Sequence, residues 1–229
     1  MLSLHHKDLY METHYTFHHE LTHLNKKILT LSAMVEERVQ KAAEVINTQD
    51  LKVIQSIILS DYEVDEMEVE IEEDCLKILA LHQPVAKDLR FLIAVIKINN
   101  EMERIADIAV SIAMRVQNIT KFKHQTAENY DFSEMSSRVL VMLKKSIDAL
   151  VNRDATVAKA IFLDDDAVDS LRNRCYEDIK ERIRKDPEHP GYHINTYLMA
   201  RHLERIGDRA VNIAEEVIYF VEGTITRFA

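Results

Sequence analysis

Residues that interrupt helices are scarce in this chain. Its 229 residues include three prolines, which lie in only two places, Pro84 and the pair Pro187 and Pro190, and three glycines that stand apart. A β-sandwich or β-barrel uses glycine or proline at most turns, so this composition excludes an all-β fold. A phosphate-binding loop needs clustered glycines, so P-loop and dinucleotide-binding folds are excluded as well. We therefore expect an all-α protein.

Apolar residues recur three and four positions apart along most of the chain, which is typical of amphipathic helices. The pattern predicts six helices, separated by polar breaks and by the two proline-containing turns. They span about residues 17–46, 50–82, 87–118, 133–151, 154–185 and 193–222.

The second half of the chain repeats the first. Asp50-Leu-Lys-Val53 and Asp154-Ala-Thr-Val157 begin equivalent helices 104 residues apart, and Glu103-Arg-Ile-Ala-Asp107 matches Glu204-Arg-Ile-Gly-Asp208 at an offset of 101. We expect two tandem three-helix bundles related by internal duplication. The first repeat spans residues 11–119, the linker 120–132 and the second repeat 133–223. The duplication does not predict how the two bundles pack together.

Charge and hydropathy narrow the class of protein further. The formal net charge of −10 disfavours nucleic acid as a partner, because that binding surface is basic. No apolar run is long enough to span a membrane, and the first ten residues lack the apolar core of a signal peptide. Cys75 and Cys175 are too few for a disulfide scaffold and fall on apolar stripes. We expect a soluble cytoplasmic protein, with Met11 as an alternative start.

Each repeat contains two pairs of carboxylates spaced four residues apart, which places both members of a pair on one helix face. These acids interrupt stripes of apolar residues, where an uncompensated carboxylate costs several kcal/mol on burial. Pairing with cations or coordination of a metal would remove that cost. The eight candidate metal ligands are Asp61, Asp65, Glu103, Asp107, Asp165, Asp169, Glu204 and Asp208.

The pairs are placed symmetrically about the two turns. Residue 84 is the midpoint of Asp61 and Asp107 and also of Asp65 and Glu103, and the equivalent midpoints of the second repeat fall between Asp186 and Pro187. Residues equidistant from the turn of an antiparallel hairpin lie at one level, here roughly 30 Å from the turn. Four facing carboxylates suit Mg, Ca, Mn or Fe, with Zn as a further possibility. The alternative is a solvated acidic face, or acids neutralised by Arg104, Arg115 or Arg205.

The stretch Gln83-Pro-Val-Ala-Lys-Asp-Leu-Arg90, followed by the two Glu-Arg-Ile-(Ala/Gly)-Asp motifs, resembles the PhoU family of phosphate-uptake regulators over residues 14–220. The resemblance implies two similar three-helix bundles and multinuclear iron or zinc clusters, or other divalent cations, on the eight carboxylates. Ala106 stands where the family motif usually has glycine.

The resemblance also implies a regulator rather than an enzyme. Such a protein acts by contact with a phosphate ABC transporter and a sensor histidine kinase at the inner face of the cytoplasmic membrane, and represses the phosphate-starvation response when phosphate is plentiful. We expect it to associate peripherally with these membrane complexes, and to form a homo-oligomer such as a homodimer.

Other functions remain open from the residues alone. His19-Glu-Leu-Thr-His23 matches the HExxH pattern of zinc metalloproteases, in which two histidines bind zinc and the glutamate acts as base. A ferritin-like di-iron oxidase is disfavoured because neither Glu103 nor Glu204 is followed by a histidine three residues later. A metal-free helical adaptor is the third alternative.

Overall fold

A computed structural model describes the backbone of residues 2–121 and 130–226, and the side chains of residues 15–121 and 130–226. The described residues form only helices and turns, which confirms the all-α prediction. Most of the expected linker, residues 122–129, lies outside the described residues. The helices are α1 (Leu2–Thr48), α2 (Leu51–Leu59), α3 (Asp61–His82), α4 (Ala86–Ile119), α5 (Ser133–Asn152), α6 (Ala155–Lys185) and α7 (Pro190–Glu222).

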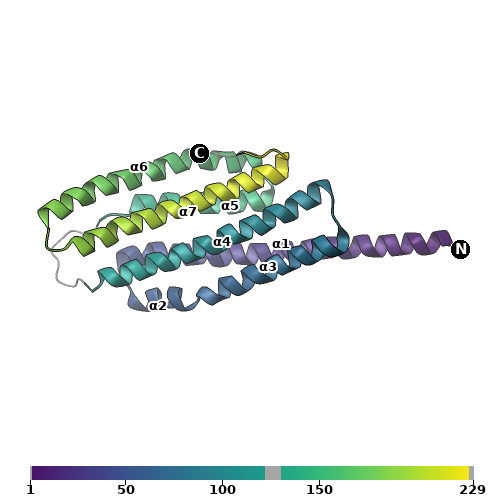
Figure 1. The fold of residues 1–229 in the computed structure, drawn as a ribbon, viewed down its shortest axis with the longest axis horizontal. Helices are drawn as coiled ribbons and strands as arrows, with labels where there is room; N and C mark the ends of the chain where they lie inside the picture. The colour runs from purple at the N-terminus through teal and green to yellow at the C-terminus, as the bar shows by residue number, and fades with distance from the viewer. Residues whose placement is uncertain (1, 122–129, 227–229) are drawn as a thin grey trace.

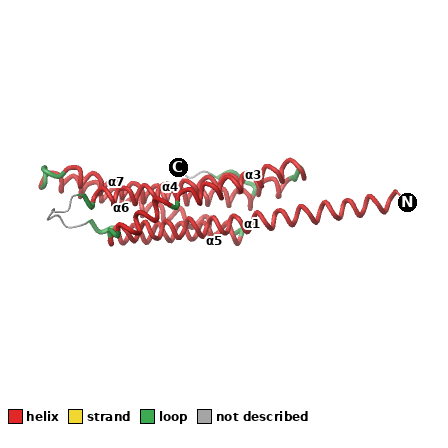
Figure 2. The backbone as a smooth tube through the Cα atoms, turned by 90° about the horizontal axis from the view of Figure 1, so that it is seen from below, coloured by secondary structure: helices red, strands yellow, loops and turns green. Residues whose placement is uncertain are grey.

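The helices form two layers. Helices α6, α7, α4 and α3 lie side by side in one layer, and α1 and α5 lie in the other, with the N-terminal end of α1 extending past the rest of the molecule (Figures 1 and 2). The repeated aspartates explain why equivalent helices begin where they do. Asp50 accepts hydrogen bonds from the backbone N–H groups of Lys52 and Val53, and Asp154 caps α6 in the same way.

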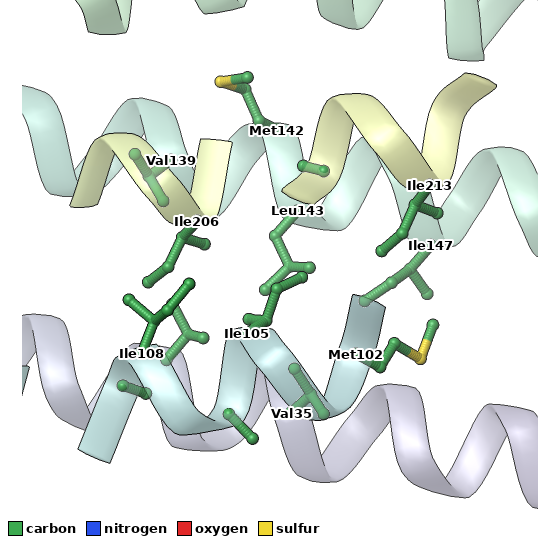
Figure 3. Close-up of a cluster of buried hydrophobic side chains, with 14 of the residues drawn as sticks. Val35, Met102, Ile105, Ile108, Val139, Met142, Leu143, Ile147, Ile206 and Ile213 are labelled. Atoms are coloured by element: carbon green, nitrogen blue, oxygen red, sulfur yellow. The ribbon is translucent and has the colours of Figure 1, made fainter. Parts of the chain in front are cut away.

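The two repeats pack together through α4 and α7, which run antiparallel. Lys97 near the start of α4 lies 3.1 Å from Glu216 near the end of α7, while Arg115 near the end of α4 contacts Asn195 near the start of α7. Figure 3 shows Ile105 of α4 pointing toward Leu143 of α5 at the centre of this contact. The buried residues of both repeats form one continuous hydrophobic core.

Helix boundaries differ from the prediction in three places. Helix α1 begins at Leu2 rather than near residue 17, because neither proline nor glycine occurs in this stretch to end it. The second predicted helix is broken at Ser60, whose backbone carbonyl accepts a hydrogen bond from Arg38 of α1. Helix α7 begins at Pro190 rather than 193, since proline fits the first turn of a helix.

Candidate metal centres

The first carboxylate cluster, Asp61, Asp65, Glu103 and Asp107, lies where α3 faces α4. Asp61 and Asp65 occupy the first two turns of α3, and the other two acids lie on the middle of α4. Burial, together with repulsion from Asp107, Asp65 and the neighbouring Glu68, raises the pKa of Glu103 to about 7. The structure therefore brings the four acids of this repeat close enough to repel one another.

In the described part of the chain, Arg38 of α1 is the cation that forms an ion pair with an acid of the first cluster. Its side chain is only 6% exposed, and its Nη1 lies 2.9 Å from Asp61 Oδ1. Its Nη2 donates to the backbone carbonyl and the hydroxyl of Ser60. Burial raises the pKa of Asp61, Arg38 opposes the rise, and Asp107 and Asp65 reinforce it. Arg38 thus compensates one acid of the four.

The second cluster, Asp165, Asp169, Glu204 and Asp208, lies at the equivalent contact of α6 with α7. Burial raises the pKa of Asp165 to about 6, with repulsion from Asp208, Asp169 and Glu204 as further causes. Arg172 is the cation in this cluster. Its Nη2 lies 3.2 Å from Glu204 and 3.5 Å from Asp169, so it bridges the two helices.

These cations are not the ones considered from the sequence. Arg104 pairs with Glu101 at 3.5 Å, and Arg115 donates to Asn195 at 3.4 Å. Burial raises the pKa of Asp208, and Arg205 opposes that rise less than Arg209 and Arg172 do. Sequence reasoning missed Arg38 because it lies on another helix, 23 residues before Asp61. Arg172 was detectable, since it follows Asp169 by three residues on one helix face.

The donor chemistry of both clusters fits a hard metal ion, because carboxylate oxygens are the ligands that Mg, Mn and Ca prefer. In the part of the chain that the structure describes, however, no three His, Cys, Asp or Glu side chains stand in an arrangement that could hold a metal. Arg38 and Arg172 instead draw Asp61, Asp169 and Glu204 into ion pairs. Binding a cation would therefore require these side chains to leave their ion pairs.

The HExxH residues lie within α1 beside α3. The Glu20 carboxylate lies 2.7 Å from His82 Nε2 and 3.5 Å from Lys77 Nζ, so its two oxygens contact side chains of α3. His19 and His23 are exposed and border a cavity of about 200 Å³. This geometry gives no support to a protease.

The remaining sequence expectations concern the cysteines and the membrane. Cys75 and Cys175 are both fully buried, and burial raises their thiol pKa values to about 12 and about 11. They act as small apolar residues of the core. Among the described residues, no helix combines the length and the apolar character needed to cross a bilayer.

The chain matches the PhoU domain family twice, over residues 28–116 and 132–217. It belongs to the PhoU family. The "Phosphate-specific transport system accessory protein PhoU homolog" of Clostridium acetobutylicum is 32% identical over 208 residues, which cover 90% of this chain and 94% of the relative. The chain is also similar to the crystal structure of PhoU from Pseudomonas aeruginosa, with a TM-score of 0.87, 32% identity, and coverage of 91% of this chain and 100% of that one.

A second structural neighbour is the phosphate transport system regulatory protein PhoU from Streptococcus pneumoniae. It has a TM-score of 0.83 and 26% identity, and the match covers 93% of this chain and 100% of that one. The PhoU family consists of accessory and regulatory proteins rather than enzymes. The duplicated fold read from the sequence is the fold of this family.

The alanine in the first PhoU motif is compatible with this fold. A methyl group added at the equivalent Gly207 would lie 3.4 Å from Met142 Cε and 3.5 Å from Asp165 Oδ1, which is close to ordinary contact. Ala106 itself is buried in the core of the first repeat. The substitution therefore leaves the acids of the first cluster in place.

Because burial and repulsion raise the folded-state pKa of Glu103 from 4.5 to about 7, we expect stability to depend on pH. A group with a raised folded pKa binds more protons when folded, so stability falls as pH rises through that pKa. In EDTA, the melting temperature should rise when pH is lowered from 8 to 6.5, and differential scanning calorimetry can measure this.

His202 opposes this rise, because burial and neighbouring arginines lower its pKa from 6.5 to about 4. The unfolded state therefore takes up this proton first, and His202 begins to destabilise the fold toward the lower end of the pH window. Because His202 is unchanged in a Glu103 variant, comparison of the two proteins isolates the contribution of Glu103. The Glu103→Gln variant should lose most of the slope between pH 8 and 6.5. An unchanged slope in that variant would assign the effect to other groups.

Proposed function

We propose that this chain is an accessory protein of a phosphate-specific transport system, and that it regulates phosphate uptake and the phosphate-starvation response. The observation that carries this proposal is the match of both PhoU domains, together with relatives of that name aligned over nine-tenths of the chain. The proposed mode of action is contact with a phosphate ABC transporter and a sensor histidine kinase at the membrane, as the family resemblance implies.

A complementation experiment tests this function. In a bacterium that lacks its own PhoU, expression of this chain should restore repression of a phosphate-starvation reporter in high-phosphate medium. The chain should also co-purify with the transporter from detergent extracts of such cells. If the chain folds in these cells yet leaves the reporter derepressed, and does not associate with the transporter, the proposal is wrong.

We further propose that the carboxylate clusters bind metal ions and so stabilise the surface that docks these partners. The support is the donor set: eight acids in two facing groups, several with raised pKa values caused by burial and mutual repulsion. A cation placed among them lowers that repulsion and links α3 to α4 or α6 to α7. Iron and zinc are the ions that the family resemblance favours, with Mg, Mn and Ca as alternatives.

Metal content is the direct measurement. Untagged protein should carry metal by mass spectrometry, and the double variant Glu103→Gln with Glu204→Gln should carry much less. At 100 times its Kd, a bound ion should stabilise the fold by about 2.7 kcal/mol, and EDTA should remove that gain. Protein that carries no metal, and whose melting temperature ignores added cations, would instead favour the metal-free helical adaptor.

A further inference from the structure

We infer that the outer face of α3 is a docking surface for a basic amphipathic helix of a partner protein. This inference rests on the proposed contact with partner proteins, and it specifies the face and the chemistry of that contact. It does not depend on the metal proposed for the carboxylate clusters. An exposed apolar stripe and an excess of acids on α3 carry the argument, and the equivalent helix α6 has neither.

The apolar stripe runs along the side of α3 that faces away from the core. Helix α3 packs into the core through buried residues such as Val64 and Ile71. The residues two positions earlier lie about 200° further round the helix, because each residue of an α-helix turns by about 100°. Among them are the exposed residues of the stripe, which are Tyr62 (59% exposed), Val69 (51%) and Leu76 (53%).

No helix in the described part of the chain covers this stripe. Helix α3 packs against α1, α2 and α4, and Figure 1 shows it at one edge of its layer. Single exposed apolar residues are common on proteins, but these three recur every seven residues on one face. A seven-residue apolar repeat is the spacing of a seam between two packed helices. The stripe therefore fits a helix as its occupant.

The charge of α3 decides which kind of helix fits. Glu66 and Glu73 lie on the same face between the apolar residues, are exposed, and form no ion pair with any described residue. The whole of α3 carries nine acids and one lysine. A partner that covers this face must supply lysine or arginine, because juxtaposed like charges disfavour association.

The same charge disfavours two other occupants of the stripe. A second copy of this chain would bring its own acids against these acids. A membrane surface that contains anionic lipids attracts basic rather than acidic helices. A basic amphipathic helix satisfies both the apolar stripe and the acids.

The equivalent helix of the second repeat has a different surface. Helix α6 lies at the opposite edge of the same layer (Figure 1). At the offset of 104 its residues in the positions of the stripe are Asp166, Asn173 and Lys180. The aligned segment, residues 165–186, carries seven acids against six lysines and arginines. An edge helix of this fold thus needs neither the apolar stripe nor the acidic excess, and both belong to α3 alone of this pair.

A designed peptide tests the surface directly. The probe is a fluorescein-labelled helical peptide with leucine at two positions of each heptad and lysine at the flanking positions. Fluorescence anisotropy follows its binding to the full-length protein in EDTA, at about 0.15 M salt. The lysine peptide should bind saturably, and a control peptide with glutamate in place of each lysine should bind at least about tenfold more weakly.

Variants of the α3 face should weaken this binding. The triple variant Tyr62→Asp, Val69→Asn and Leu76→Lys gives α3 the residues of α6 without changing the net charge, and should weaken binding at least about tenfold. The double variant Glu66→Lys with Glu73→Lys keeps the apolar stripe and reverses the charge. It should weaken binding of the lysine peptide by about tenfold or more.

Matched variants lie outside α3. Leu163→Asp with Val141→Lys replaces exposed apolar residues of α6 and α5 at unchanged net charge. Glu177→Lys with Glu181→Lys makes the same charge change as the α3 double variant at exposed positions of α6. Both should bind the lysine peptide within about twofold of the unmodified chain. Circular dichroism establishes that each variant is folded.

The outcomes separate this inference from the proposed function. If the unmodified chain restores repression of the phosphate-starvation reporter, the triple variant should not. Full repression or full peptide binding by the triple variant would overturn the inference and leave the proposed function intact. Failure of the unmodified chain to repress the reporter would count against the proposed function, and the peptide measurement would still decide whether α3 is a docking surface.

Two further measurements test the other occupants. In analytical ultracentrifugation, the unmodified chain and the triple variant should have the same oligomeric state. A dimer that becomes a monomer in the triple variant would show that a second copy covers the stripe. Binding to phosphatidylglycerol vesicles that the triple variant loses would assign the face to lipid. Either result would overturn the inference.

Discussion

Replacing Ile105 by alanine is expected to lower the free energy of unfolding by about 3–4 kcal/mol, the middle of the range for a fully buried isoleucine. Ile105 has no exposed surface and lies on α4 where α4 meets α5 and α7, with Leu143 opposite (Figure 3). Because neighbouring side chains come from both repeats, the cavity cannot collapse by moving one helix alone. Urea denaturation followed by circular dichroism measures the loss.

The same experiment tests whether the repeats unfold together. Since the buried residues form one continuous core, a single transition should persist in the Ile105→Ala variant at a lower urea midpoint. Ile194→Ala is the matched control, because Ile194 on α7 is 50% exposed and its truncation should cost about 0.5 kcal/mol or less. Two separated transitions would show instead that each repeat is stable alone.

Most of the fold could be predicted from the sequence because its signals are local. Helix periodicity, the turns at Pro84 and Pro187, and the capping residues Asp50 and Asp154 each depend on residues close in the chain. The packing of the repeats through antiparallel α4 and α7 could not be predicted in this way. Both helices bury residues on several faces, so their sequences do not specify which face meets the other repeat.

For the candidate site, the position of each acid along its helix could be predicted from the sequence. The cation that pairs with each acid could not. The symmetry of Asp61 and Asp107 about Pro84 requires only hairpin geometry, and the repulsion by which Asp107 raises the pKa of Asp61 agrees with that placement. Arg38 lies on α1. The spacing of residues in the sequence does not predict how α1 packs against the α3–α4 hairpin, so the contact of Arg38 with Asp61 could not be predicted.

Arg38→Met should lower the free energy of unfolding by about 2–3 kcal/mol at pH 7.5, somewhat less than for breaking a fully buried ion pair because Asp61 is 35% exposed. Methionine is the residue that the second repeat carries at the equivalent position. The change therefore keeps a long aliphatic side chain and removes the guanidinium. The Ser60 carbonyl and Asp61 both lose their donor. Chemical denaturation at pH 7.5 measures this loss.

The deficit in Arg38→Met should shrink at low pH. Burial already raises the pKa of Asp61, and removal of the opposing Arg38 charge raises it further. A raised folded pKa means that stability is lost as pH rises through it and regained as pH falls, so the deficit of the variant should be smaller at pH 4.5 than at pH 7.5. Arg104→Met, which removes an exposed arginine from α4, should cost about 0.5 kcal/mol or less. If Arg38→Met shows the same deficit at both pH values, the loss comes from the Ser60 carbonyl and from packing, and Arg38 does not act as the counter-ion of Asp61.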